Sequence, residues 1–141
     1  MSLLELRHVS KAYNEKVLAL DDVNLKVEKG EWLAVMGPSG SGKSTLMNII
    51  GCMDSATSGE VILDGEVLTD ATPEELTRYR RDKIGIVFQQ FHMIPYLTAV
   101  ENIMVAQYYH SMPDRDEAMA ALERVGLADR ASHLPSQLSG G

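Results

Sequence analysis

Nine residues near position 40 constrain the fold of this chain more than any other stretch. Residues 37–45 read Gly-Pro-Ser-Gly-Ser-Gly-Lys-Ser-Thr, which matches the pattern G-x-x-x-x-G-K-[ST] at every fixed position. The apolar run 32–36 predicts a parallel strand buried on both faces, and apolar residues at helical spacing follow over 43–53. A strand, a glycine-rich turn and a helix in this order predict an α/β fold with an anion site at the helix N-terminus.

The residue types in this stretch suit a nucleoside triphosphate. Three glycines let successive backbone N–H groups point inward with no side chain in the way. Lys43 would reach the β- and γ-phosphates as a point charge, and the Ser44 hydroxyl would ligate Mg²⁺ beside them. The predicted cofactor-binding residues here are Gly37, Pro38, Ser39, Gly40, Ser41, Gly42, Lys43, Ser44 and Thr45.

The composition limits which classes of molecule the chain is expected to bind. The 141 residues carry a net charge of −7, which argues against non-specific binding of nucleic acid, because that binding depends on neutralising phosphates. No apolar run approaches the ~20 residues that span a bilayer, so we expect a soluble chain that reaches a membrane only through a partner. The single cysteine, Cys52, cannot form an internal disulfide and is predicted to be a small buried residue in a reducing cytosol.

Around this core the sequence predicts an antiparallel β region and then helices. Residues 3–9 and 23–28 are predicted strands, and residues 61–68 form a hairpin around Asp64-Gly65. The apolar run 84–88 predicts a second buried strand. Helix N-caps are predicted at three positions, Thr72, Thr98 and Asp114.

Three features leave two interpretations open on residues alone. Tyr13, in the polar connector 10–14, suits half-buried packing and adenine stacking about equally. Gln89 follows a predicted buried strand, where α/β sheets bind ligands, but a lone glutamine there is more often a solvated loop residue. Four cations, Arg78, Arg80, Arg81 and Lys83, fit a phosphate patch less well than a helix C-terminus favoured by its dipole.

The final residues, Gln137-Leu138-Ser139-Gly140-Gly141, complete a recognisable set with the phosphate loop, Gln89 and Tyr13. In this order the chain resembles the nucleotide-binding domain of ATP-binding-cassette (ABC) transporters, whose LSGGQ signature begins with the last four residues. The segments 48–54, 80–85 and 88–91 resemble the branch that serves lipoprotein-release and macrolide export. The resemblance implies a P-loop NTPase core with an antiparallel β subdomain over 1–89, and a Q-loop and helical subdomain over 90–141.

The resemblance also implies roles for single residues. Tyr13 would stack on adenine. Lys43 and Gln89 would be the catalytic residues, with Ser44 and Gln89 as contacts to Mg²⁺. Ser139, Gly140 and Gly141 would contact the γ-phosphate of ATP held by the opposite subunit, and the apolar loop 93–97 would receive a coupling helix from a membrane subunit.

As a family member, the chain would be the ATP-binding subunit of an export system and an ABC-type ATPase. It would act as a homodimer or with a paired nucleotide-binding subunit, at the cytoplasmic face of the membrane, with an integral membrane permease and without nucleic acid. The family's Walker B aspartate, catalytic glutamate and switch histidine lie beyond the signature. We therefore expect the C-terminal part of the fold to be missing and the chain to be catalytically incomplete.

Two other classes of protein share parts of this pattern. A soluble, non-transport ABC protein would use the same loop as a nucleotide-gated binding module, but the negative charge and exporter-like segments argue against it. A phosphate-loop kinase or GTPase is disfavoured by Leu138-Ser139-Gly140-Gly141 and by the lack of an Asn-Lys-x-Asp guanine motif.

Overall fold

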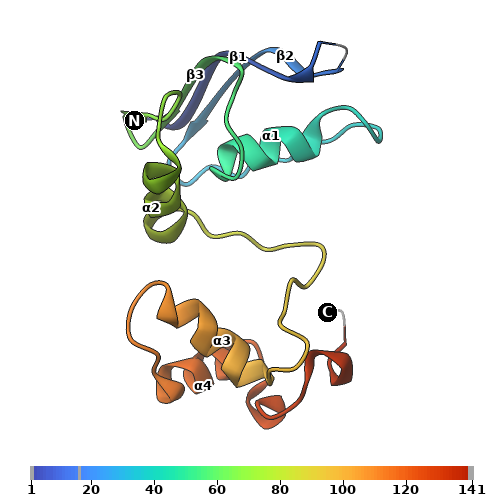
Figure 1. Cartoon of the computed structure of the whole chain (residues 1–141), viewed down its shortest axis with the longest axis vertical. Coiled ribbons are helices and arrows are strands. Elements are labelled where there is room, and N and C mark those ends of the chain that lie inside the picture. The colour runs from blue at the N-terminus through green and yellow to red at the C-terminus, as the bar shows by residue number, and fades with distance from the viewer. Residues whose placement is uncertain (1, 16, 140–141) are drawn as a thin grey trace. The chain divides into compact units, whose positions relative to one another are not determined.

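A computed structural model describes residues 2–15 and 17–139 (Figure 1). The chain divides into two compact units, residues 1–86 and residues 87–141. The first holds a β-sheet and two helices, and the second is helical.

The sheet of the first unit is antiparallel and has four strands in the order β2-β1-β3-β4. Its members are β1 (Ser2–Asn14), β2 (Val17–Glu28), β3 (Ser58–Leu63) and β4 (Glu66–Val67). The predicted early strands and the hairpin at Asp64-Gly65 are confirmed, with Ile62 opposite Val67. The interpretation of residues 10–14 as a polar connector is wrong, because these residues continue β1 and Ala12 pairs with Leu18 of β2.

One face of the sheet packs on helix α1 (Lys43–Ile50) to form the core of this unit. Leu4, Leu6 and Val9 of β1 are buried with Leu46 and Ile49 of α1. Helix α2 (Pro73–Lys83) adds buried Tyr79 to the same cluster. Each aliphatic side chain buried in this way contributes about 2 kcal/mol. The core therefore fixes α1, and with it the end of the glycine-rich stretch, against β1.

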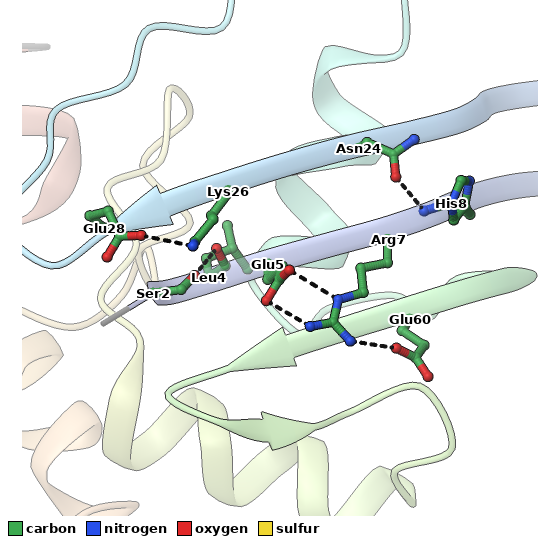
Figure 2. A network of polar contacts seen from close by, with 9 residues as sticks. All are labelled: Ser2, Leu4, Glu5, Arg7, His8, Asn24, Lys26, Glu28 and Glu60. Atoms are coloured by element: carbon green, nitrogen blue, oxygen red, sulfur yellow. Dashed lines mark hydrogen bonds and ion pairs between the residues drawn. The ribbon is translucent and has the colours of Figure 1, made fainter.

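The opposite face of the sheet carries charged side chains (Figure 2). The Arg7 guanidinium donates to both carboxylate oxygens of Glu5, at 3.0 and 3.1 Å, and to Glu60 of β3 at 3.3 Å. Lys26 and Glu28 of β2 pair at 3.3 Å. These exposed pairs add little stability, typically below 1 kcal/mol each. They mark the solvent side of the sheet.

The two predicted buried strands are not strands in this structure. Residues 31–38 and 84–88 have no regular secondary structure and lie outside the sheet. Trp32 is 98% exposed, and the side chain of Val87 is fully exposed. A strand requires a neighbouring strand for its backbone hydrogen bonds, and the described residues place none beside these segments. The sequence therefore identified segments of strand-like composition but not their pairing.

The second unit is built on α3 (Ala99–Tyr108) and α4 (Arg115–Arg124), followed by the short 3₁₀ turns η1 (Ala128–Arg130) and η2 (Pro135–Gln137). Its core joins Val100 of α3 to Ala118 and Leu122 of α4. The predicted caps Thr98 and Asp114 are confirmed, since both side chains accept backbone N–H groups of the first turn. Among the described residues, no helix has the length and apolar character needed to cross a membrane.

Candidate functional site

The glycine-rich stretch passes from β2 to α1 across a point of close contact. Gly42 is the N-cap of α1 and has φ 90°. A Cβ built on Gly42 would lie 2.5 Å from the carbonyl oxygen of Ala19 in β2 and 3.0 Å from Leu20. Both the backbone conformation and the space therefore require glycine at this position. Gly40 also has a positive φ, 79°, but nothing lies within 4 Å of its Cβ position.

Lys43 folds back over the loop that precedes it. Its ammonium donates to the carbonyl oxygens of Gly37 at 2.7 Å and Pro38 at 2.6 Å, and to the Ser41 hydroxyl at 3.2 Å. The turn between these partners is closed by the Ser41 N–H, which donates to the Pro38 carbonyl at 3.3 Å. A positive charge is thus held at the mouth of the loop, next to the start of α1.

The first turn of α1 offers unneutralised donors. Gly42 provides no side-chain cap, and the turn contains no acidic residue. The N–H groups at a helix start and the positive end of the helix dipole both favour an anion. With Lys43 beside them, these donors fit the phosphates of a nucleotide, so the residues present suit the predicted ligand. Ser44, the predicted Mg²⁺ contact, is exposed in the same turn, and Ser39 is exposed in the loop.

Tyr13 lies beside this helix. Its hydroxyl is 3.4 Å from the Thr45 hydroxyl and donates to the Asp54 carboxylate at 3.3 Å, while 53% of the residue is exposed. Two predicted residues, Tyr13 and Thr45, are therefore brought together from β1 and α1. Sequence reasoning missed their neighbours Lys11 and Asp54, whose ammonium and carboxylate meet at 2.7 Å.

The other predicted residues belong to the second unit, and their roles stay predictions. Gln89 is exposed in irregular backbone. Ser139 lines a cavity of about 430 Å³ whose wall is mostly apolar and includes Phe91, Met93 and Ile103. Gly140 and Gly141 lie outside the described residues.

The loop before α3, predicted to meet a membrane subunit, is held by one side chain. The Asn102 amide accepts from the Ile94 N–H at 2.8 Å. It also donates to the carbonyl oxygens of Ile94, Leu97 and Thr98 at 3.0 to 3.2 Å. Tyr96 is nevertheless 79% exposed. The loop is therefore ordered at its ends and presents an aromatic ring to solvent.

The four cations of the α2 region have protein partners in most cases. Arg80 donates to the Cys52 carbonyl at 2.5 Å, Arg81 pairs with Asp82 at 2.6 Å, and Lys83 pairs with Asp64 at 2.8 Å. Arg80, Arg81 and Lys83 lie in the last turn of α2. This supports the helix-terminus interpretation over the phosphate patch. Cys52 is buried, as predicted, and burial raises the pKa of its thiol.

Comparison with known proteins identifies what the chain resembles. The family model described as ABC transporter matches residues 20–141. The chain is 46% identical to the uncharacterized ABC transporter ATP-binding protein MJ0796 of Methanocaldococcus jannaschii, over 99% of this chain and 63% of that protein. It is 45% identical to the macrolide export ATP-binding/permease protein MacB of Burkholderia pseudomallei, over 99% of this chain and 22% of that protein.

Solved structures agree in fold. A dimeric, post-hydrolysis structure of the MJ0796 cassette bound to ADP and Pi superimposes with a TM-score of 0.87 at 45% identity, covering 97% of this chain and 63% of that one. A second dimeric structure of this cassette gives a TM-score of 0.85. The α/β cassette fold predicted from the sequence is confirmed for the part that this chain covers. The chain spans less than two thirds of the length of these relatives.

Proposed function

This chain belongs to the ABC transporter family, and from that premise we propose that it is the ATP-binding subunit of an export system. The observation that carries the proposal is the start of α1, where Lys43 and uncapped N–H groups converge next to Gly42. The relatives named above are transporter proteins, and MacB is named for macrolide export. This favours a transport subunit over a soluble, nucleotide-gated binding module.

The residues of the first unit would contact the whole nucleotide, from its phosphates to its base. Backbone N–H groups of the loop and of the first turn of α1 would receive the phosphates. Lys43 would exchange its bonds to the carbonyls of Gly37 and Pro38 for phosphate oxygens, and the Ser44 hydroxyl would hold Mg²⁺. The metal would offset phosphate charge. Tyr13, already tied to Thr45, would stack on the adenine.

The second unit would add a contact to the metal and contacts to the nucleotide of a neighbouring subunit. Gln89 would contact Mg²⁺ and water, and Ser139, Gly140 and Gly141 would meet the γ-phosphate of ATP held by a second subunit. The dimeric structures of the MJ0796 cassette support a paired arrangement. The name of MacB joins an ATP-binding part to a permease, which supports an integral membrane partner. The subunit would then work at the cytoplasmic face of the membrane.

We further propose that these 141 residues bind Mg-ATP but turn it over poorly. General-base catalysis needs a group poised on the attacking water. Among the residues with proposed roles, none is a carboxylate or a histidine. Binding and hydrolysis should therefore separate in this chain.

The test compares this chain with a version extended to the full length of its relatives. Calorimetry should show Mg-ATP binding by both, and a phosphate-release assay should show turnover only by the longer one. Lys43→Ala in each background should weaken Mg-ATP binding roughly 30-fold. ATP turnover by the 141-residue chain would contradict the proposed separation of binding from hydrolysis. If neither chain binds Mg-ATP, the proposed function is contradicted.

A further inference from the structure

Regular backbone pairing is interrupted at neighbouring positions of three strands of the sheet. His8 of β1, Asp22 of β2 and Gly59 of β3 all have positive φ, at 52°, 48° and 88°. The register of β1 shifts there against both neighbours, between Leu6 and Val9 against β2 and between Arg7 and Ser10 against β3. The His8 and Asp22 side chains meet at 2.7 Å, and a Cβ on Gly59 would lie 2.2 Å from the His8 carbonyl oxygen. The distortion is therefore one bulge shared by three strands.

The bulge is also fixed by the Asn24 side chain. Its carbonyl oxygen accepts the His8 N–H at 2.9 Å, and Figure 2 shows this bond between neighbouring strands. The Asn24 amide in turn donates to the Asp22 carbonyl at 3.0 Å. Backbone groups that lost their ladder partners are thus satisfied by a side chain.

The bulge changes which side chains of β1 face α1. Leu4 and Leu6 are buried on the core face, and the next buried residue is Val9, three positions later instead of two. From Val9 onward the alternation places Lys11 and Tyr13 on the α1 side. Without the extra residue, Ser10 and Ala12 would occupy that face.

Lys11 reaches the turn that follows α1. Its ammonium donates to the Asp54 carboxylate at 2.7 Å and to the Ser55 carbonyl at 2.7 Å. The side chains of Lys11 and Asp54 are only 12% and 28% exposed. Burial works to raise the pKa of Asp54, but the hydrogen bonds from Lys11 and the Ser55 N–H outweigh it and lower the pKa. The pair is thus a charged, partly desolvated contact.

Tyr13 is held from two directions by this pair. The Lys11 ammonium lies over the ring, 5.1 Å from its centroid, and the Asp54 carboxylate accepts from the Tyr13 hydroxyl. One face of the ring is therefore covered by a cation, and the hydroxyl is fixed next to Thr45 of the phosphate-binding helix. Because 53% of the residue is still exposed, the ring keeps accessible surface on which a planar ligand could stack.

We propose that Lys11 and Asp54 are positioning residues for the nucleobase: they fix the Tyr13 ring in the orientation in which one face accepts a purine at a set distance from the phosphate loop. This inference rests on the proposed function. An aromatic ring that is already ordered loses less conformational freedom when the base stacks on it. The pair would therefore act on binding of the base and not on binding of the phosphates.

The test measures calorimetric affinity of the 141-residue chain for ATP and for inorganic tripolyphosphate, which lacks a base. Tyr13→Ala should weaken ATP about tenfold, the typical worth of one stacked base. Lys11→Met and Asp54→Asn should each weaken ATP binding about threefold to fivefold, the net worth of one ordinary hydrogen bond. Affinity for tripolyphosphate should stay within about twofold in all three variants.

Two further variants sharpen the result. Lys11→Met combined with Tyr13→Ala should bind ATP no more weakly than Tyr13→Ala alone, because the pair acts through the ring. Lys26→Met is the matched control, since Lys26 lies in β2 and pairs with Glu28 in solvent. It should change neither affinity. Far-UV circular dichroism melts should confirm that each variant is folded.

The outcomes separate this inference from the proposed function. If Tyr13→Ala weakens ATP selectively but Lys11→Met and Asp54→Asn do not, the positioning role is overturned and nucleotide binding stands. The role is also overturned if either variant weakens ATP and tripolyphosphate equally, because that indicates a general structural effect. If the unmodified chain binds neither ligand, the proposed function itself fails.

Discussion

Helix α1 and helix α3 begin in opposite ways. At the start of α3, the Thr98 hydroxyl accepts the Glu101 N–H, and the Glu101 carboxylate accepts the Thr98 N–H at 2.8 Å. At the start of α1, Gly42 has no side chain to offer, and the first turn contains no acid. Side chains of the protein satisfy the N–H groups at the start of α3, whereas no side chain caps the N–H groups at the start of α1.

The difference teaches where this fold gives up local stability. Glycine at an N-cap, in place of a residue with a capping side chain, costs a few tenths of a kcal/mol. Helices α2 and α4 are also capped, by Thr72 and Asp114, and have acidic residues in their first turns. Among the four α-helices of residues 2–15 and 17–139, α1 alone lacks both devices. Burial of Leu46 and Ile49 holds α1 in place instead.

The largest effect on stability is expected from Gly42→Ala, which changes the glycine at the start of α1. The alanine Cβ would meet the Ala19 carbonyl oxygen at 2.5 Å, at a φ of 90° that disfavours any side chain. Strain and clash together should lower the free energy of unfolding by about 3 kcal/mol. Urea unfolding measures this loss. Gly40→Ala is the control, since its φ is also positive but its Cβ meets nothing, so the loss should be about 1 kcal/mol. Equal losses would show that the contact with β2 is unimportant.

The next largest effect is on affinity for Mg-ATP, which should depend on the donors at the start of α1. Lys43→Ala removes the charge held at the loop by the carbonyls of Gly37 and Pro38. Charge-assisted hydrogen bonds to phosphate should be lost, so affinity for Mg-ATP should fall by about 2 kcal/mol, or roughly 30-fold. Calorimetry measures the fall, and Lys83→Ala is the control because Lys83 pairs with Asp64 on another element. An unchanged affinity would mean that the anion site is not at α1.

The uncapped start of α1 was predictable from sequence because its chemistry is local. Gly42, Lys43 and Ser44 form a fixed pattern, and Thr98 with Glu101 forms another, so each pattern predicts its own few residues of structure. The strand assignments for 32–36 and 84–88 failed for the opposite reason. Apolar composition predicts that a segment is suited to a sheet, but pairing depends on other segments of the chain.

The position of Lys11 was not predictable by alternation alone. The sequence predicts a strand over residues 3–9 that ends before a polar connector, but β1 continues to Asn14. The signal was present in the spacing of Leu4, Leu6 and Val9, where one interval is three residues instead of two. A bulge that keeps one face apolar produces such an interval. Only the structure shows that it carries Lys11 to Asp54.

A smaller effect is expected at the capped start of α3. Thr98→Ala removes the hydroxyl that accepts the Glu101 N–H, and should lower the free energy of unfolding by about 1 kcal/mol. Loss of the helical signal at 222 nm in urea measures this change. Thr98→Ser keeps the hydroxyl and should lose at most a few tenths of a kcal/mol. Neither variant should change affinity for Mg-ATP, and a change would show that the two helix starts are energetically linked.

The smallest effect is a dependence of stability on pH that α3 has and α1 lacks. The hydrogen bonds from the Thr98 N–H and hydroxyl lower the pKa of Glu101 below its ordinary value. A carboxylate with a lowered folded pKa contributes stability that is present above the ordinary glutamate pKa of about 4.3. That contribution is lost as the pH falls through the lower, folded value.

Thermal melts at pH 7, 5, 4 and 3 should therefore show that the melting temperature falls more steeply with acid in the unmodified chain than in Glu101→Gln. Because Glu75 of α2 has its pKa lowered in the same way by Thr72, part of the acid loss should remain in the variant. Parallel curves for the two proteins would mean that solvent screens the exposed Glu101 carboxylate completely. The capped and uncapped helix starts would then differ in hydrogen bonding and not in charge.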